Sequence, residues 1–274
     1  MAVKKPRVKK SETVEFRIGA QLYTLRDYLT DPEELHSALE RLKKIGYEGV
    51  EVASIPADIP YSAVQAMLAE LQLDCVAVHL DSNLILDNPR RAAHCARELQ
   101  CPRIVYPYPK GIALTSRDDL CDFAGRLSRS ADVLARSGMR LCYHNHALEF
   151  VWVEGMSIFD WLIGEDILSA MGFELDTHWA QRGGASPAQL CQEIEGRLPI
   201  LHCKDCVVNP AGESLFAPVG YGNLDWDSII RAAVKARCTW FVVEQDNCYG
   251  QDPYVCLAQS YKTLLGYRSM KVFE

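Results

Sequence analysis

Short apolar runs alternate with longer amphipathic segments along almost the whole of this 274-residue chain. Nearly every position in these runs is apolar, as is typical of strands buried on both faces of a parallel sheet. Each run is followed by a helical pattern or by room for one, which indicates right-handed strand–helix–strand units. Eight such units predict a single (β/α)8 TIM barrel. The eight runs are FRIGAQLYT, GVEVAS, LDCVAVHL, RIVYPYP, MRLCYHNH, GFELDTH, LPILHCKD and TWFVVEQD.

The segments between the runs carry helix-end signals. In DPEELHSALERLKKIG, residues 31–46, the apolar residues fall on one helical face. Asp31 is a suitable N-cap, with Pro32 at the first helical position and Glu34 as a capping-box partner. Gly46 can end the helix. Similar helix-end signals recur in DNPRRAAHCAREL, SPAQLCQEIEG and DPYVCLAQSYKTLLG.

The main competing architecture is a doubly wound open sheet. That fold usually carries a glycine-rich phosphate turn, and neither GxGxxG nor GxxxxGK[ST] occurs in the sequence. No Pro-, Gly- or Ser-rich linker divides the chain. The first residues, MAVKKPRVKK, are basic, and no apolar signal-peptide segment follows them. We therefore expect a flexible basic tail at residues 1–15 and one barrel domain at residues 16–274.

Composition narrows the range of partners. The net charge of −7 argues against a broad nucleic-acid interface. No apolar run approaches the roughly 20 residues of a membrane span. The eleven cysteines are scattered, and Cys203 and Cys206 form a lone C-x-x-C, a weak zinc or redox signal. Buried thiols in a reducing compartment predict a cytoplasmic protein. The oligomeric state stays open, with a homo-oligomer as one alternative.

Polar residues gather where the predicted strands end. In a TIM barrel, catalytic residues lie at the carboxyl ends of the strands. Five of the seven histidines occupy such positions, whereas His36 and His94 fall within predicted helices. This segregation indicates one functional site at the mouth of the barrel. The strand-end residues are Gln21, Glu51, His79, His144, His146, Glu149, Asp176, His178, His202, Lys204, Asp205, Glu244 and Asp246.

Several carboxylates at one mouth repel one another unless a cation or shared protons compensate. Glu149, Asp176 and Glu244 would supply oxygen donors, and His202 would add one imidazole. This donor set suits one divalent metal ion, with Mn²⁺ as the first choice and Mg²⁺, Co²⁺ or Zn²⁺ as alternatives.

Eight motifs in a fixed order give the sequence a family resemblance. From about residue 18 to residue 266 the chain resembles the xylose isomerase-like TIM barrels, specifically the sugar phosphate isomerase/epimerase group. The motifs are GAQLYTLRD, GYEGVEVA, VAVHL, YHNHALEF, FELDTHWAQRGGASP, LHCKD, APVGYGNLDW and WFVVEQDNCYGQDP.

The resemblance implies a metal held by residues of the fifth to eighth barrel strands. Asp176 matches the family's aspartate, His202 its histidine and Glu244 its last glutamate. For the fifth strand we expect Glu149, the only carboxylate in YHNHALEF. His144, which occupies the strand position itself, is the rival ligand.

The implied function is a sugar isomerase or epimerase acting on a keto-sugar or a sugar derivative. A proton next to a carbonyl is removed through a metal-stabilised enediolate, with Glu149 and Glu244 doing the proton work. His144 or His146 is the alternative base, and Lys204 either polarises the carbonyl or pairs with Asp205. The side chains expected to contact the sugar are Gln21, Glu51, His79, His146, His178 and Trp179.

Other functions remain open at this point. Dehydratases and lyases of inososes or 3-keto-glycosides begin with the same proton removal. No basic cluster for a phosphate group stands out in the sequence. An endonuclease IV-like repair enzyme is disfavoured by the acidic balance. A non-catalytic sugar-binding barrel is the third alternative.

Overall fold

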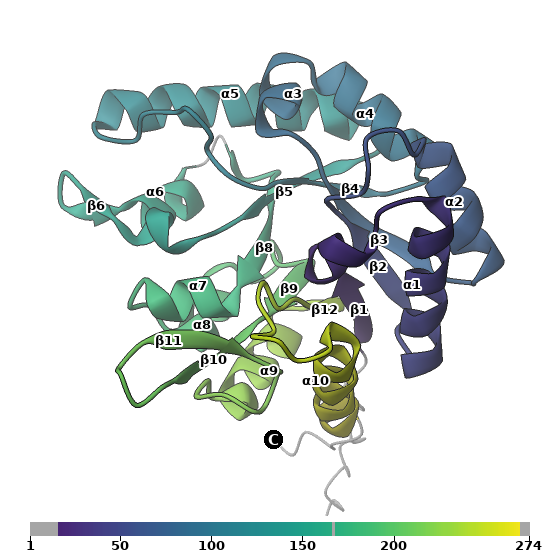
Figure 1. Cartoon of the computed structure of the whole chain (residues 1–274). Helices are drawn as coiled ribbons and strands as arrows, with labels where there is room; N and C mark the ends of the chain where they lie inside the picture. Colours follow the sequence, from purple (N-terminus) through teal and green to yellow (C-terminus); the bar gives the residue numbers. More distant parts are fainter. Residues whose placement is uncertain (1–15, 166–167, 269–274) are drawn as a thin grey trace, which may run out of the picture.

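All eight predicted strands form and close into one parallel barrel (Figure 1). The computed structural model describes residues 16–165 and 168–268. The first strand pairs with the last, so that Ile18 lies opposite Phe241. The predicted single (β/α)8 barrel is therefore confirmed. Its strands are β1 (Arg17–Gln21), β2 (Gly49–Val52), β3 (Asp74–His79), β4 (Arg103–Tyr106), β5 (Arg140–His144), β8 (Gly172–Asp176), β9 (Ile200–Cys203) and β12 (Trp240–Val243).

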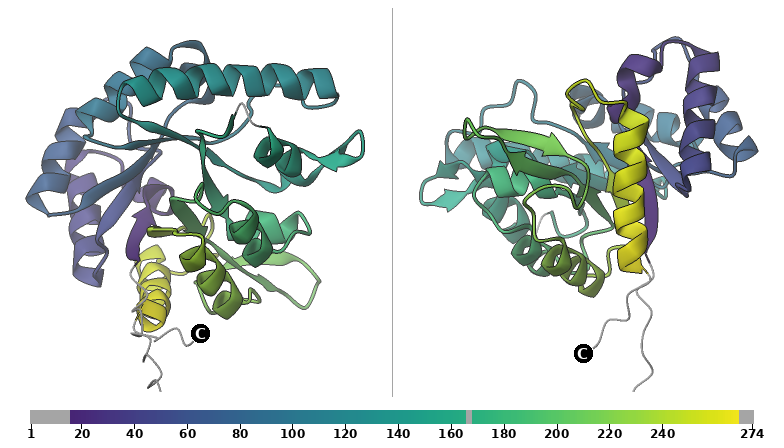
Figure 2. Two further views of the ribbon diagram at one scale, coloured as in Figure 1. Left: turned by 180° about the vertical axis from the view of Figure 1, so that it is seen from behind. Right: turned by 60° about the horizontal axis from the view of Figure 1, so that its bottom comes forward.

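Helices surround the barrel, and α10 runs beside β1 in each view (Figures 1 and 2). The helix predicted after the first strand forms: Asp31 caps it by accepting hydrogen bonds from the backbone N–H groups of Glu33 and Glu34. The α-helices are α1 (Pro32–Ile45), α2 (Tyr61–Glu70), α3 (Ser82–Asp87), α4 (Pro89–Glu98), α5 (Arg117–Arg136), α6 (Ile158–Gly164), α7 (Thr177–Arg182), α8 (Pro187–Glu193), α9 (Trp226–Lys235) and α10 (Pro253–Arg268). Two 3₁₀ helices, η1 (Leu22–Tyr28) and η2 (Ala147–Phe150), follow β1 and β5.

Two small hairpins lie in the loops that follow β5 and β9. They are formed by β6 (Trp152–Val153) with β7 (Met156–Ser157), and by β10 (Asp205–Val208) with β11 (Ser214–Ala217). Asp205 fastens the chain that follows the second hairpin: its carboxylate accepts from the backbone N–H of Gly220 and Gly222 and from the indole N–H of Trp226. A Cβ on Gly222 would lie 2.3 Å from this carboxylate, so the turn requires glycine. The hydrogen bonds of the Asp205 carboxylate therefore hold this loop in place.

The interior of the barrel changes from apolar to polar along its axis. Alternate residues of a strand face the same side. Cys142 on β5 and Ile200 on β9 belong to a buried apolar cluster. Two residues further along the same strands stand His144 and His202, both buried. At the carboxyl end of the barrel, ionisable side chains therefore lie directly above the buried apolar cluster.

The remaining expectations concern the cysteines and the termini. All eleven cysteines are free, Cys203 and Cys206 included. No helix within the described ranges is long and apolar enough to cross a membrane. The predicted basic tail at residues 1–15 lies outside the described residues.

Candidate metal centre and active site

Four side chains from neighbouring strands converge at the carboxyl end of the barrel. His144 ends β5, Asp176 ends β8, His202 lies on β9, and Glu244 follows β12. Nδ1 of His202 lies 3.3 Å from Oε2 of Glu244 and 4.0 Å from Oδ2 of Asp176. Nε2 of His144 also lies 4.0 Å from Oδ2 of Asp176. One ligand atom from each residue lies within 4.8 Å of the others, so the four can hold a metal ion.

The hydrogen bonding of this group fits a cation. All four residues are buried. Oδ2 of Asp176 and Nδ1 of His202 make no well-aligned hydrogen bond within the described part of the chain, although Lys204 and Glu244 each lie 3.3 Å from one of them. A buried polar atom without a partner costs free energy, and burial raises the pKa of Asp176 to about 7. Coordination of a cation would satisfy both atoms.

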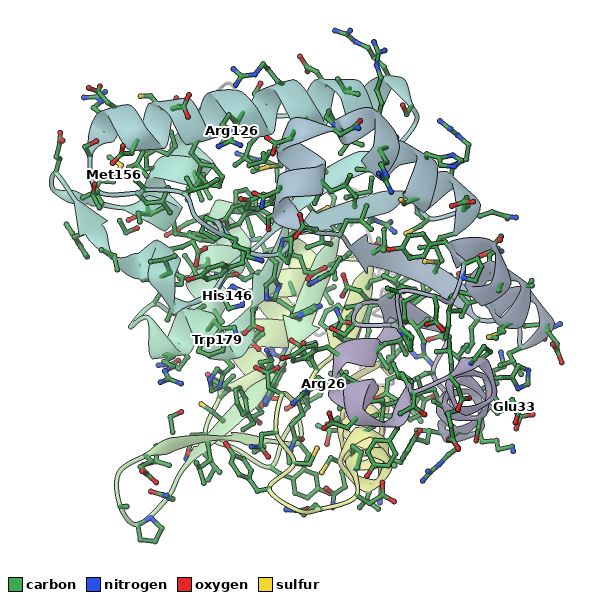
Figure 3. The ribbon with its side chains drawn as sticks, turned by 45° about the horizontal axis from the view of Figure 1, so that its top comes forward. Arg26, Glu33, Arg126, His146, Met156 and Trp179 are labelled. Atoms are coloured by element: carbon green, nitrogen blue, oxygen red, sulfur yellow. The ribbon has the colours of Figure 1, made fainter. Side chains whose placement is uncertain are left out.

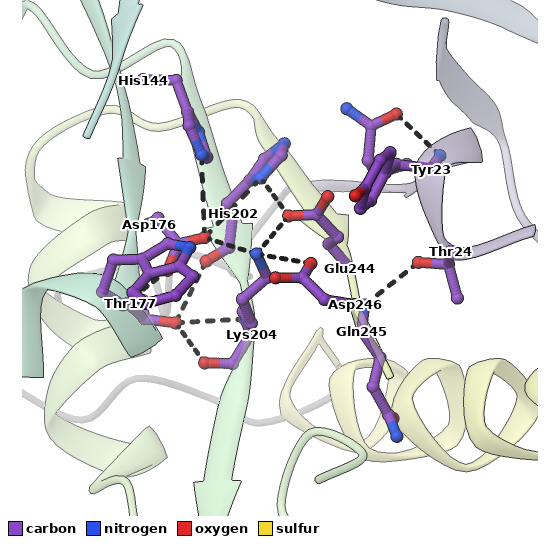
Figure 4. Close-up of polar contacts among 12 residues, drawn as sticks. Tyr23, Thr24, His144, Asp176, Thr177, His202, Lys204, Glu244, Gln245 and Asp246 are labelled. Carbon is purple, nitrogen blue, oxygen red and sulfur yellow. Dashed lines mark hydrogen bonds and ion pairs between the residues drawn. The ribbon is translucent and has the colours of Figure 1, made fainter. Parts of the chain in front are cut away.

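Lys204 stands beside these residues and is almost completely buried. Figure 4 shows its amine between three carboxylates: Nζ lies 2.6 Å from Glu244, 2.8 Å from Asp246 and 3.3 Å from Asp176. Burial opposes a positive charge here, but the three carboxylates outweigh it and raise the pKa of Lys204. Lys204 is therefore a cation held by site carboxylates. The suggested pair with Asp205 is not formed, because Asp205 accepts from the loop.

Glu149 does not join this group. It is fully buried, and it accepts a 2.7 Å hydrogen bond from the hydroxyl of Tyr143 and a 2.6 Å bond from the backbone N–H of His146. These contacts make it the reciprocal cap of η2. Burial raises its pKa to about 7. The structure thus places His144, and not Glu149, at the fifth-strand corner of the group, which favours the rival ligand His144.

A second buried layer lies beneath the first, in contact with His202. Glu51, expected to contact the sugar, places Oε2 at 2.5 Å from Nε2 of His202 and Oε1 at 3.0 Å from Nε2 of His79. Glu174 belongs to the same layer and was not predicted. The signal for it was present: Glu174 stands two residues before Asp176 on one strand, and therefore faces the same side.

A cavity of about 460 Å³ opens onto the group. Figure 3 places His146 and Trp179 toward the middle of the barrel mouth. Six of the residues predicted for the site line the cavity: His79, His144, His146, Trp179, Lys204 and Glu244. Among the further lining residues are Tyr23, Tyr108 and Asp246, for which no role was predicted.

Two expected sugar contacts are placed elsewhere. Gln21 is buried at the end of β1, where its side-chain oxygen accepts from the backbone N–H of Tyr23. His178 is also buried, and its ring packs against Trp179 and Phe216 with centroids 4.9 Å and 4.5 Å away. Neither lines the cavity, so both support the residues that do.

Sequence comparison identifies the family. The model of the xylose isomerase-like TIM barrel matches residues 39–255, well over half of the chain. The chain belongs to the xylose isomerase-like TIM barrel family. The resemblance inferred from the motifs is confirmed. No curated protein shows a significant match to the sequence.

Several solved structures share the fold across nearly the whole chain. A sugar phosphate isomerase/epimerase from Parabacteroides distasonis is 20% identical and covers 94% of this chain and 96% of its own, with a TM-score of 0.78. The IOLI protein with a bound zinc atom is 15% identical, with coverages of 94% and 100% and a TM-score of 0.73. The probable 3-DHS dehydratase AsbF of Bacillus anthracis is 15% identical, with coverages of 91% and 99% and a TM-score of 0.70. At these identities the likeness establishes the fold.

Proposed function

We propose that this protein is a divalent-metal-dependent sugar isomerase or epimerase. It would remove a proton next to the carbonyl of a keto-sugar or a related sugar derivative. The observation that carries this proposal is the convergence of two buried imidazoles and two buried carboxylates beside a cavity at the barrel mouth. The isomerase/epimerase name of one similar structure and the zinc atom of another support it.

The proposed ligands are His144, Asp176, His202 and Glu244. Two imidazoles with two carboxylates suit Mn²⁺, Co²⁺ or Zn²⁺ better than Mg²⁺, which prefers oxygen ligands. When bound, the ion would act as a Lewis acid on the substrate carbonyl. Mn²⁺ remains the first choice, and Co²⁺ is a convenient probe because its visible spectrum reports its ligands.

The residues around the proposed metal centre would have different roles in the reaction. Burial opposes ionisation of Glu244, but Lys204 and His202 outweigh it and hold the pKa of this carboxyl below its usual range. Glu244 is therefore ionised at neutral pH, as a metal ligand must be. Its low pKa makes it a weak base, so as the proton acceptor it would depend on a bound ion that makes the substrate proton more acidic. His146 lines the cavity from the β5 side, and burial lowers its pKa to about 4, so that its imidazole is neutral at pH 7 and would accept a substrate proton as the alternative base. The Lys204 ammonium would hydrogen-bond a substrate oxygen, and Trp179 would form an apolar wall.

The test combines metal analysis with a deuterium-exchange screen. Purified protein should contain about one divalent ion per chain, and a panel of keto-sugars incubated with it in D₂O should yield one that incorporates deuterium next to its carbonyl. Asp176→Asn and Glu244→Gln should each abolish exchange without unfolding the protein. Asp31→Asn, the same chemical change at a remote helix cap, should leave exchange unchanged. A wild-type protein that binds metal but exchanges no keto-sugar proton would contradict the proposal.

A second candidate is a dehydratase or lyase acting on inosose or 3-keto-glycoside substrates. Lys204 and Asp246 form a 2.8 Å ion pair beside Glu244, and such a pair can protonate a departing hydroxyl or alkoxide. Deuterium uptake accompanied by loss of water or alcohol from the sugar, detected by mass spectrometry, would select this reaction. The free cysteines are consistent with a cytoplasmic location, which we also propose.

A further inference from the structure

One buried carboxylate oxygen lies beside three imidazoles. Oε1 of Glu174 is 2.9 Å from Nε2 of His79, 3.0 Å from Nε2 of His202 and 3.0 Å from Nδ1 of His144. The Glu174 side chain has no exposed surface, so the cavity and its substrate do not reach it. Burial, and then the neighbouring Glu51 carboxylate, raise the pKa of Glu174. His202 and His79 oppose this rise, so the imidazoles are what makes a glutamate tolerable at this depth.

The two proposed imidazole ligands use opposite ring nitrogens for the two layers. His202 directs Nδ1 toward Asp176 and Glu244 and directs Nε2 toward Glu174. His144 directs Nε2 toward Asp176 and Nδ1 toward Glu174. A neutral imidazole that binds a metal through one nitrogen carries its proton on the other. Both of those second nitrogens lie 3.0 Å from the same carboxylate oxygen. Nδ1 of His144 has no hydrogen-bond partner among the described residues in this arrangement, so Oε1 of Glu174 is the acceptor nearest to it.

We infer that Glu174 is a positioning residue that fixes the tautomer and the ring orientation of both imidazole ligands, His144 and His202. This inference rests on the metal centre proposed above. Glu51 contacts His202 and His79 but makes no ion pair with His144. Glu174 is therefore the carboxylate of the lower layer that lies beside both ligands. Oε1 of Glu174 selects Nδ1–H in His144. Together with Oε2 of Glu51 it also holds the Nε2–H of His202, which leaves Nε2 of His144 and Nδ1 of His202 free for the ion.

The lower layer itself does not require a second ion. His79, His144, Glu174 and His202 also bring ligand atoms within 4.8 Å of one another. An ion at that place would use the second nitrogen of both proposed ligands and would remove their last ring protons. Nε2 of His202 also lies 2.5 Å from Oε2 of Glu51, and an ion at that place would have to displace this hydrogen bond. We therefore expect one ion per chain, bound in the upper layer.

The test is Glu174→Gln, which keeps the shape of the side chain but removes the charge. Wild-type protein should bind one Co²⁺ per chain. The variant should bind Co²⁺ about 10- to 100-fold more weakly, the usual effect of losing such a partner, and should show an altered visible spectrum. In metal-free protein, ¹⁵N shifts should show the Nδ1–H form of His144 in the wild type and a mixture of tautomers in the variant. If Glu174→Gln unfolds, Glu174→Asp can replace it, because aspartate withdraws the carboxylate by one methylene. This variant should weaken Co²⁺ binding relative to wild type, by less than the 10- to 100-fold expected for Glu174→Gln.

Glu149→Gln is the matched control, because it makes the same change at an equally buried glutamate that contacts neither ligand. It should leave Co²⁺ affinity and the His144 tautomer unchanged. Wild-type affinity, spectrum and tautomer in Glu174→Gln would overturn the inference while the metal centre stands, as would equal losses in both variants. Two Co²⁺ ions per wild-type chain would overturn it in favour of a second site. A wild type that binds no ion would refute the proposed function, and the tautomer measurement would still decide the role of Glu174.

Discussion

The contacts of Glu149 predict that its replacement by glutamine stabilises the metal-free protein at alkaline but not at acidic pH. The folded chain holds the pKa of this carboxyl at about 7, against its ordinary value of 4.5. A difference of about 2.5 pK units corresponds to roughly 3 kcal/mol. Because the folded state binds the proton more tightly, this stabilisation is complete below about pH 4.5. It is lost as the pH rises to about 7.

Glutamine cannot ionise, so the variant avoids this loss. Its amide oxygen can accept from the backbone N–H of His146, and its NH₂ group can donate to the Tyr143 hydroxyl, whose proton then turns away. The difference in unfolding free energy between Glu149→Gln and wild type should therefore shift by up to about 3 kcal/mol in favour of the variant between pH 4.5 and pH 8. Urea unfolding of both proteins at the two pH values, with a chelator present, measures it. An equal destabilisation at both pH values would refute the reasoning.

Two further predictions follow from single contacts. Gly222→Ala should destabilise the fold by about 3 kcal/mol or more, because the new Cβ would lie 2.3 Å from the Asp205 carboxylate. Gly164→Ala is the control: a Cβ there has nothing within 4 Å, and the change in stability measured by thermal unfolding should be less than about 1 kcal/mol. Similar losses in both variants would contradict the steric argument. His144→Glu, which exchanges an imidazole for a carboxylate, should shift metal preference from Zn²⁺ toward Mn²⁺ and Mg²⁺ in competition binding, and an unchanged preference would remove His144 from the ligand set.

The sequence predicted the barrel because each of its signals is local and repeated. A strand buried on both faces reads as a continuous apolar run, and α1 shows both its apolar face and its Asp31 cap. The hairpins β6–β7 and β10–β11 were not predicted. Strands of two to four residues within a loop are too short to show a clear alternation of apolar and polar residues. Their positions depend on contacts far along the chain, such as those that Asp205 makes with Gly220 and Trp226.

The same distinction applies to where the structure places the residues of the site. The pleat of a strand fixes which residues face the interior, so His202 and Asp176, which pair in register, could be placed together from the sequence. Glu149 lies beyond the strand, where the backbone of η2 decides its direction, and there it turns back to cap its own loop. Glu174 lay within the predictable part and was overlooked because GFELD was read as an apolar run with a polar end.

The balance of charge in the upper layer argues for a divalent ion there. The carboxylates of Asp176, Glu244 and Asp246 face the ammonium group of Lys204. When all three are ionised, Lys204 neutralises one of them. In the metal-free protein His202 offsets a second, because Glu174 and Glu51 raise its pKa against the effect of burial. Burial raises the pKa of Asp176 although Lys204 and His202 oppose the rise, which is the expected response of a carboxyl whose charge is only partly compensated. A cation of charge two would neutralise the pocket while Lys204 stays in place. Metal binding should therefore favour the ionised form of Asp176, and affinity should fall as the pH drops below about 7.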